Sequence, residues 1–357
     1  MCIPTVMKSL FIESFRAFVT SLGIEFLEDG VVFEFPKNNF AIILHLLDRH
    51  GQPNRESDAS FEGKGQSGLD ILHLYEDRWF YCREMMEKRI LARLNTFRSI
   101  FARKCLVNYS YWDGSNAKAD ANSDGIIGNS DNSPVKKRGA DPVKGKSIRE
   151  FIEKYHPYGY AKSKFLLSLE YEGRIVAAAA FSAPRPMPRG RDELTESFRC
   201  TAGSTGSEKI IFDSYEWVRY ISLPDVRVVG GMGKLLGAFL KSLEQMQGPS
   251  HSAFEAKPVE IMTYSDQEWS AGDAYTKLGF KEVACRDAVT YFIDKNSYER
   301  LSYRKLLTRL SRHYNSPVDE KLNVLNENAL QEIISGNYYI IQNRGSRKFL
   351  LQKRDEQ

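Results

Sequence analysis

The sequence predicts an α+β fold in more than one domain, and three observations indicate it. The chain has 357 residues, enough for two hydrophobic cores. Apolar residues recur at helical spacing in some segments and in short strand-like runs in others, so helices and strands are mixed along the chain. Residues 113–146 are rich in Asp, Asn, Ser, Gly and Lys and poor in aromatic side chains, which predicts a disordered linker.

These observations divide the chain into four parts. We expect a mixed α/β domain first, then the linker, then a domain built on a mixed sheet flanked by helices, and finally an extension with a hairpin. The predicted ranges are 1–112, 113–146, 147–315 and 316–357.

The composition is that of an ordinary globular protein, with 42% hydrophobic and 27% charged residues. The formal net charge of +4 permits nucleic-acid binding without requiring it. Five cysteines are scattered without C-x-x-C spacing, which indicates free thiols in a reducing compartment, the cytoplasm or nucleus, with an organelle left open. No apolar run reaches the roughly 18 residues of a membrane span, so no membrane partner is expected.

The first domain is predicted to begin with a helix and to continue into strands. Apolar residues of the first helix lie on one face, and Gly23 ends it. Asp29-Gly30 is a hairpin turn between the first two strands. The predicted ranges are helix 7–22, strands 24–27, 31–35 and 40–47, loop 48–68, strand 69–75, and a helix from Glu76 to about Asn95.

Basic and aromatic residues interleave over residues 97–111. Such a mixture can grip a nucleic-acid backbone and stack bases, although a strand and helix with solvated basic faces is the alternative. The residues concerned are Phe97, Arg98, Phe101, Arg103, Lys104 and Tyr109.

Two motifs lie in the linker. Residues 120–131 match a twelve-residue calcium loop, with oxygen ligands at positions 1, 3, 5 and 12 and glycine at 6, but nothing helical flanks them, so a solvated polar loop is the alternative. The basic run 134–138 fits a nuclear import patch, a phosphate contact or solvating charge.

The second domain is predicted to begin with a helix capped at Ser147, where Glu150 completes a capping box. An antiparallel hairpin follows, and a long apolar strand leads to the most informative stretch of the chain. The predicted ranges are a helix to residue 156, strands 165–171, 174–182, 215–223, 259–264 and 287–294, a basic helix 298–312, and a final hairpin 336–351 that turns at Arg344-Gly345.

The glycine-rich turn after strand 215–223 predicts an anion site. Glycine has no Cβ, so the backbone at Gly230, Gly231 and Gly233 can bend sharply and approach a phosphate. The amides there open a helix, whose positive dipole end favours an anion, and Lys234 would add a point charge. The spacing fits neither a Walker loop nor a dinucleotide-binding fingerprint.

This turn, together with Tyr275-x-x-Leu278-Gly279-Phe280, resembles the GNAT acyltransferase superfamily. Arg227 and Gly230 fit that family's Gln/Arg-x-x-Gly-x-Gly/Ala turn, but Met232 occupies the last small position. The resemblance implies acetyl-CoA or another acyl-CoA as cofactor, held by the turn, and Tyr275 as the acid that protonates the departing thiolate. The alternative is that Tyr275 packs and Gly279 caps a helix. The turn residues are Arg227, Val229, Gly230, Gly231, Gly233 and Lys234.

A general base is less well marked. Glu216 lies on the strand that leads into the turn, and His156 follows the first helix of the second domain. Either side chain would accept a proton if its pKa were suitably placed.

A closer resemblance is to the Mom DNA-modification group, carried by residues 264–280, and to phage proteins that fuse such a domain to a Vsr-like nuclease of the PD-(D/E)XK type. Phe35-Pro36, Ala41-Ile42 and residues 71–79 match the nuclease half. Its metal-binding carboxylates, however, fall on Val32 and Ile43, which cannot bind a metal. The resemblance therefore implies a degenerate nuclease domain without a metal site. Other acids and histidines are out of register: Glu34, Asp48, His45, His50 and His73.

The sequence thus predicts a GNAT-like acyl-group transferase or a Mom-like modifying enzyme that acts on nucleic acid. Two alternatives remain open. One is a catalytically inactive protein that binds DNA or RNA, and the other is a metal-dependent endonuclease that uses out-of-register carboxylates.

Overall fold

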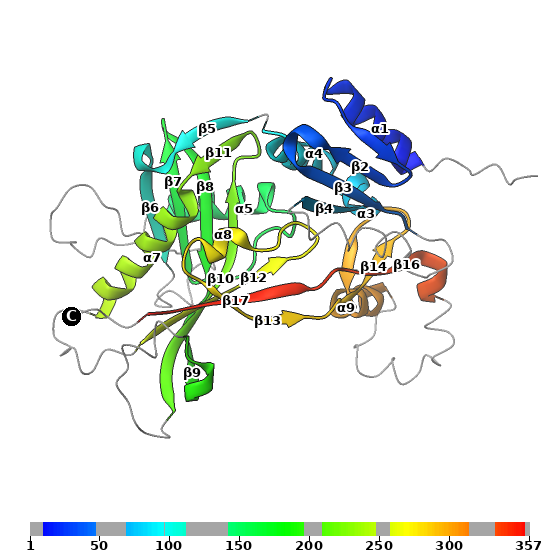
Figure 1. Cartoon of the computed structure of the whole chain (residues 1–357). Coiled ribbons are helices and arrows are strands. Elements are labelled where there is room, and N and C mark those ends of the chain that lie inside the picture. The colour runs from blue at the N-terminus through cyan, green and yellow to red at the C-terminus, as the bar shows by residue number, and fades with distance from the viewer. Residues whose placement is uncertain are drawn as a thin grey trace, which may run out of the picture. The chain divides into compact units, whose positions relative to one another are not determined.

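The computed structural model describes residues 10–47, 69–95, 97–111, 142–195, 209–247, 258–313 and 333–353 (Figure 1). Mixed sheets and helices confirm the α+β fold class. The chain divides into two compact units, each made of separate segments. The first unit contains Met1–Asn95, Asp266–Ala271 and Cys285–Ser346, and the second contains Thr96–Ser265, Gly272–Ala284 and Arg347–Gln357. No described helix is long and apolar enough to cross a membrane.

The first unit contains a four-stranded sheet packed against helices through an aromatic core. The strand order is β1-β2-β3-β4, and only β3 and β4 run parallel. Phe11 and Phe15 of α1 and Trp79 of α3 are fully buried against the sheet, which accounts for the helical spacing of the apolar residues in α1. The elements are α1 Leu10–Ser21, β1 Leu27–Asp29, β2 Val32–Phe35, β3 Phe40–His45, β4 Asp70–Tyr75, α3 Glu76–Tyr81 and α4 Arg83–Arg93.

A three-stranded antiparallel sheet of order β15-β14-β16 completes the first unit. Helix α9 covers it by burying Leu306 beside Phe292 and Leu301. The predicted basic helix therefore starts later than residue 298, because Arg300 belongs to a strand. The elements are β14 Thr290–Asp294, β15 Arg300–Ser302, α9 Tyr303–His313 and β16 Tyr338–Gln342.

The second unit is built on a mixed sheet of order β13-β17-β12-β10-β8-β7-β6, with β9 paired to β10. Helix α5 packs on one face through Ile148 and Ile152, and α7 packs on the other through Leu235 and Phe239. The strands are β6 Leu106–Tyr111, β7 Phe165–Tyr171, β8 Arg174–Phe181, β9 Arg185–Arg189, β10 Ile210–Ser222, β12 Val259–Asp266, β13 Lys281–Arg286 and β17 Ser346–Lys353. The helices are α5 Pro142–Tyr155, α7 Gly231–Gln247 and α8 Asp273–Thr276.

Two short strands of the second unit, β5 Arg98–Phe101 and β11 Val226–Val229, form a separate parallel pair. Residues 97–111 were expected in the first domain, but β6 pairs with β7 along its whole length and so belongs to the second unit. The side chain that anchors this strand, Tyr109, is buried among the core residues of the second unit.

The expected C-terminal hairpin does not form. Strand β16 pairs with β14, whereas β17 lies between β13 and β12 in the sheet of the second unit. The reason is that each strand buries its apolar residues in a different core: Tyr338 and Ile341 in the first unit, and Phe349 in the second. Residues 316–357 are therefore not an independent extension.

Helix α5 begins at Pro142, five residues before the predicted cap at Ser147. Proline is tolerated in the first turn of a helix, where its missing N–H would have no acceptor. The last five residues of the predicted linker 113–146, which are residues 142–146, therefore belong to this helix. Its calcium-like loop, 120–131, and basic run, 134–138, lie outside the described residues.

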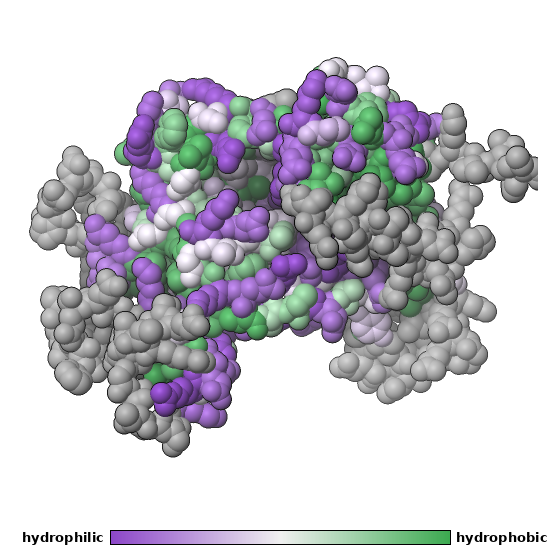
Figure 2. Space-filling model, viewed as in Figure 1, coloured by the Kyte–Doolittle hydropathy of each residue, from purple (hydrophilic) through white to green (hydrophobic). Residues whose placement is uncertain are grey.

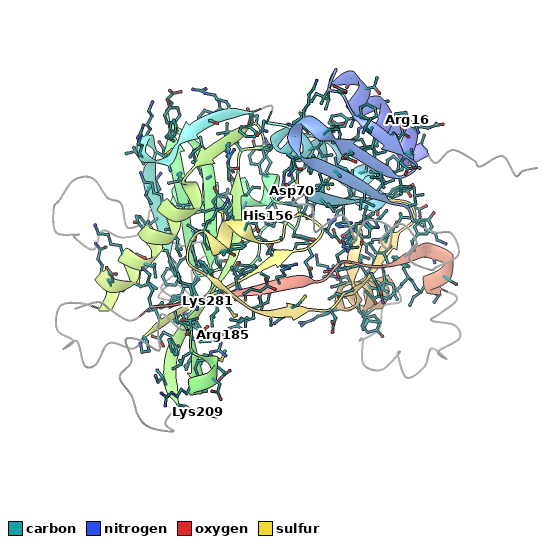
Figure 3. The ribbon with its side chains drawn as sticks, viewed as in Figure 1. Arg16, Asp70, His156, Arg185, Lys209 and Lys281 are labelled. Carbon is teal, nitrogen blue, oxygen red and sulfur yellow. The ribbon has the colours of Figure 1, made fainter. Side chains whose placement is uncertain are left out.

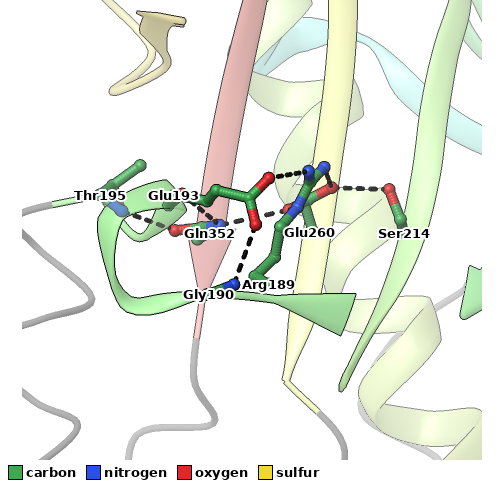
Figure 4. A network of polar contacts seen from close by, with 7 residues as sticks. All are labelled: Arg189, Gly190, Glu193, Thr195, Ser214, Glu260 and Gln352. Carbon is green, nitrogen blue, oxygen red and sulfur yellow. Dashed lines mark hydrogen bonds and ion pairs between the residues drawn. The ribbon is translucent and has the colours of Figure 1, made fainter. Parts of the chain in front are cut away.

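A buried ion pair fixes the start of the central strands of the second unit (Figure 4). Arg189 of β9 donates two hydrogen bonds, of 2.9 and 2.8 Å, to Glu260 of β12, whose side chain is fully buried. Ser214 of β10 and Gln352 of β17 also donate to this carboxylate. Burial alone would raise the pKa of Glu260, but these hydrogen bonds outweigh it and lower the pKa. Four strands are thereby tied together at one end of the sheet.

The first unit contains a second buried network, in which one arginine serves two carboxylates. Arg300 of β15 binds Asp77 of α3 through both carboxylate oxygens, at 2.8 and 2.9 Å, and binds Glu268 at 2.7 Å. All three side chains are at most 2% exposed. Burial raises the pKa of Glu268 to about 7, and the positive charges of Arg300 and Arg78 offset this rise only in part. This network joins segments 76–81, 266–271 and 300–302 of the unit.

We predict that Glu268→Gln flattens the pH dependence of stability. Because the folded-state pKa lies above the ordinary value of 4.5, the folded chain binds this proton more tightly, and the free energy of unfolding falls as pH rises from about 4.5 to about 7. The amide removes that loss, which we expect to be on the order of 1–3 kcal/mol in urea titrations at about pH 5 and about pH 8.

The matched control for this experiment is Glu282→Gln, which removes a carboxylate from an exposed pair with Arg347 and should leave the slope as in the wild type. Equal slopes for wild type and Glu268→Gln would contradict the raised pKa.

Candidate functional site

The two central parallel strands of the second unit part at their carboxyl ends. Strands β10 and β12 pair over Asp213–Glu216, and the pairing stops there although both strands continue. At the point of parting, the Thr263 hydroxyl donates to the carbonyl of Trp217 at 3.1 Å, where a backbone amide would otherwise bind. An opening at the carboxyl ends of parallel strands is where open α/β sheets bind their ligands.

A β-bulge at Val218 sets which side chains reach this opening. Trp217 pairs with Phe181 of β8 and Arg219 with Ala180, so β10 contains one extra residue. Strand alternation would place Trp217 and Tyr220 on opposite faces, but the bulge brings both rings to the α7 side, with their centroids 6.1 Å apart. Two carbonyls of the bulge are satisfied by side chains, that of residue 218 by Arg219 and that of residue 219 by the Trp217 indole.

A row of buried hydroxyl groups lines the α7 side of the opening. Tyr275 of α8 is hydrogen-bonded to Thr263, and since the Thr263 hydrogen is already donated to a carbonyl, the phenol donates. Tyr220 lies close to the first turn of α7, because a Cβ added to Gly231 would stand 2.8 Å from its hydroxyl oxygen. Burial raises the pKa of both phenols, so both keep their protons at neutral pH.

The side chain of Tyr275 is positioned by aromatic packing. Its ring lies 5.9 Å from Trp217, 5.8 Å from Phe280 and 5.5 Å from Phe349, measured between centroids. Gly279, at φ +87°, ends the short helical segment and turns the chain so that Phe280 returns under Tyr275. The structure therefore shows the capping glycine and the packed tyrosine of the alternative interpretation, and the catalytic role of Tyr275 stays a prediction.

The glycine-rich turn opens α7 as expected. Gly230 has φ +76°, a conformation that favours glycine, and the amide of Lys234 donates to its carbonyl at 3.0 Å. The amides of residues 231–233 therefore belong to the first helical turn and have no acceptor within the helix. Space around Gly230 is open, since a Cβ there would meet only Ala102, at 3.9 Å.

Lys234 does not supply the point charge that was predicted for this turn. Its ammonium donates to the carbonyl oxygens of Ala102, at 3.0 Å, and Cys105, at 2.6 Å, and so holds the 3-10 turn η3 Ala102–Lys104. The sequence suggested a point charge for a phosphate, but the long side chain reaches back to carbonyls 129 and 132 residues away. We therefore assign Lys234 a positioning role.

The other residues predicted before the turn lie on the surface of β11. The side chains of Arg227 and Val229 are exposed, and the Arg227 guanidinium lies 5.6 Å from the centre of the Phe97 ring. Gly233 is closely packed, since a Cβ there would lie 3.3 Å from Leu278. Among the residues predicted to bind the cofactor, the backbone of 230–233 has the geometry for an anion.

The two predicted bases lie on the other face of the sheet. Tyr215 and Trp217 point to α7, so Glu216 between them points to the α5 side, where the charge of Arg219 attracts it. Arg219 donates to the carbonyl of Gly159 at 3.1 Å, and burial lowers its pKa. His156, labelled in Figure 3, follows α5, and its Nδ1 accepts the amide of Tyr158 at 3.2 Å.

Sequence reasoning missed three residues of this site: Thr263, Tyr220 and Arg219. A threonine and a tyrosine in apolar strands match ordinary sheet composition, so no local pattern marks them. Arg219 lies in a strand-like run, where one charged residue gives no sign of a special position. The face of the sheet on which Arg219 lies depends on the bulge at Val218, and no local sequence pattern predicts that bulge.

In the first unit, the two positions expected to have lost metal ligands are apolar and buried. Val32 and Ile43 pair across β2 and β3 and form a small cluster with Ile71. The nearby acids are occupied, because Glu76 accepts the amide of Leu47 and Asp77 binds Arg300. In the described part of the chain, no three His, Cys, Asp or Glu side chains are grouped to hold a metal.

Two of the predicted histidines meet in the first unit. His45 Nε2 lies 2.9 Å from His73 Nδ1, and burial lowers the pKa of His73 to about 2. This pair stacks beside Tyr75, whose ring is 4.4 Å from that of His45. Asp48 and His50 lie outside the described residues.

No family model and no curated protein matches this chain. Five chains of solved structures match, among them the apo form of a mutant agmatine N-acetyltransferase. The identity is 12%, the TM-score is 0.23, and the match covers 58% of this chain and 82% of that chain. A likeness of this size carries no conclusion about the activity of this chain.

We predict that the protein does not cleave single- or double-stranded DNA with magnesium or manganese, because the strand positions that would hold the ion carry Val32 and Ile43. The measurement is cleavage of labelled DNA with and without EDTA. Cleavage that EDTA abolishes, and that Glu34→Gln also abolishes in a folded protein, would overturn this expectation.

Proposed function

We propose that the second unit transfers an acyl group from an acyl-CoA thioester to a nucleophile. The observation that carries this proposal is the parting of β10 and β12, with the Tyr275 hydroxyl buried at the opening. The order of elements supports it: helix α5, hairpin β7–β8, long strand β10, glycine turn, α7, β12, Tyr275 and Gly279-Phe280 follow one another as the GNAT resemblance implies.

The residues present fit the coenzyme at the glycine turn. The amides of residues 231–233 offer donors to a pyrophosphate at the positive end of a seventeen-residue helix. Glycine at 231 lets the first turn of α7 pack closely against Tyr220 and Val228, with which a Cβ would collide. A linear pantetheine chain would run between the separated strands, from this turn toward Tyr275.

An acyl-CoA supplies an activated acyl group and a thiolate leaving group. Tyr275 would donate its proton to that thiolate, and its raised pKa keeps the proton in place at neutral pH. Glu216 is the preferred base, because it lies on β10 next to the opening. His156, in the loop after α5, is the second candidate.

The finer interpretation, a Mom-like enzyme that modifies nucleic acid, rests on the resemblance of residues 264–280. Part of that run packs in the first unit, where Glu268 binds Arg300, and part carries Tyr275. We propose nucleic acid as the acceptor class on this ground.

We predict that Tyr275→Phe lowers kcat by about 100-fold with little change in KM for acetyl-CoA, because only the donated proton is lost. The ring contacts remain, so the melting temperature should stay close to that of the wild type. The measurement is release of free thiol from acetyl-CoA with a panel of amine and nucleic-acid acceptors. Since the pKa is raised, kcat should not fall through loss of this proton below about pH 10.

An unchanged kcat for Tyr275→Phe would remove Tyr275 from the mechanism. Thr263→Val is the companion variant, since it deletes the hydroxyl that accepts from Tyr275 and should lower kcat less.

We predict that Gly230→Asp weakens CoA binding at least about tenfold more than Gly230→Asn. Both side chains tolerate the positive φ of this position and have nearly the same shape, so the difference isolates the charge beside the pyrophosphate. The measurement is calorimetric titration with CoA. Gly173→Asp, in the β7–β8 turn at φ +74° with open space around it, is the matched control and should bind normally. Equal affinities of the Asp and Asn variants would refute the pyrophosphate assignment.

A further inference from the structure

An exposed two-stranded surface lies beside the glycine turn and has no part in the acyl-transfer proposal. Strands β5 and β11 pair in parallel, with Arg227 opposite Ser99 and Val229 opposite Phe101. Ile100 and Val228 point into the core, so the alternate residues face outward. We call this outer face, together with Phe97, Arg98 and turn η3, the β5–β11 surface.

Cations and aromatic rings are paired on this surface. The Arg103 guanidinium lies 5.0 Å from the centre of the Phe101 ring, and Arg227 lies 5.6 Å from Phe97. Arg98 lies 6.0 Å from the ring of Tyr171 on β7. Phe101 is 47% exposed, and Val229, which lies opposite it in the strand pair, is 40% exposed. Large apolar side chains grouped at the surface and mixed with cations indicate a binding face.

The positive charge of this surface is not balanced by ion pairs. Across the described ranges, no carboxylate is ion-paired with any of its four cations, which are Arg98, Arg103, Lys104 and Arg227. The acids nearest in sequence and pairing, Asp225 and Glu172, do not form such pairs. Figure 2 shows hydrophilic and hydrophobic side chains intermixed over β5 and β11.

Helix α4 of the first unit provides the contrast. Three of its four basic residues are matched by an acid, Arg83 by Glu87, Lys88 by Glu84 and Arg93 by Asp70, and the fourth, Arg89, lies 4.6 Å from the centre of the Trp269 ring. The cations of the β5–β11 surface have no such ion pairs within the described ranges.

The surface is also held in one shape before any partner binds. The Lys234 ammonium fixes the carbonyls of Ala102 and Cys105, and the amide of Cys105 closes the same turn at 2.9 Å. Arg103 and Lys104 therefore project from a rigid turn. That the half-buried Lys234 donates to two carbonyls is explained if the turn must present these cations, because preorganisation lowers the cost of binding.

We propose that the β5–β11 surface binds single-stranded nucleic acid. One unpaired base would stack on the exposed Phe101 ring beside Arg103, and Arg98, Lys104 and Arg227 would contact the flanking phosphates. A duplex keeps its bases stacked inside and cannot use an exposed ring in this way, so the aromatic component selects single strands. The proposal does not depend on acyl transfer, since it requires neither the coenzyme nor Tyr275.

The test is fluorescence anisotropy of the full-length protein with a labelled oligothymidylate of about twelve nucleotides, over roughly 50 to 200 mM salt. Phe101→Ala should weaken binding about tenfold, and Phe101→Trp should restore it. Lys104→Gln combined with Arg227→Gln should lower the slope of log K against log salt by about 1.4, which corresponds to two phosphate contacts on a single strand.

The matched control is Arg304→Gln combined with Lys305→Gln, which removes two exposed cations from α9 and should leave binding unchanged. The proposal is overturned if Phe101→Ala binds as tightly as wild type, if the α9 variant loses as much affinity as the surface variant, or if duplex binds as tightly as single strand. Loss of CoA binding in Phe101→Ala with normal oligonucleotide binding would also overturn it, and would assign the ring to the nucleotide end of the coenzyme.

Discussion

The arrangement of the second unit depends on one constraint: β10 must pair with β12 at its start and with β8 at its end. Pairing with β12 ends at Glu216, whereas the β8 pairing runs on to Ser222, so the two parallel strands separate. The Arg189–Glu260 network closes the paired end, and Thr263 caps the first carbonyl of the open end. If β10 paired with both β8 and β12 along its whole length, there would be no opening at the centre of the sheet.

The bulge at Val218 converts this opening into a site with two sides. By adding one residue, it brings Tyr220 to the face of Trp217 and Tyr275, and it brings Arg219 to the face of Glu216. Protonated phenols are thus collected on the α7 side and a carboxylate with its cation on the α5 side. Acid and base of an acyl transfer must act on different atoms, the leaving group and the attacking nucleophile, so this separation suits the proposed reaction.

Within each unit, buried charges join segments that are distant in sequence. Arg300 and Asp77 are 223 residues apart, and their pair draws α3 and β15 into one core. A residue pair of this kind is costly to desolvate and is tolerated because every partner is hydrogen-bonded or paired. Acids in the first turn of a helix ordinarily favour the helix dipole, but here Asp77 is the counter-ion of Arg300 and Glu76 accepts the Leu47 amide.

The sequence by itself determined the features that depend on local chemistry. Glycines at 230, 231 and 233 specify a turn that opens a helix, the Tyr275–Phe280 motif specifies a capped segment that returns, and apolar residues at 32 and 43 specify core positions. Only the tertiary structure determined which groups the long side chains contact and which strands pair with each other. Lys234 donates to two carbonyls, and Arg227 lies beside the Phe97 ring. Strand β17 does not form the expected hairpin but lies in the middle of the sheet of the second unit. The physical reason is that such partners lie many residues away, where neither periodicity nor propensity carries information about contact.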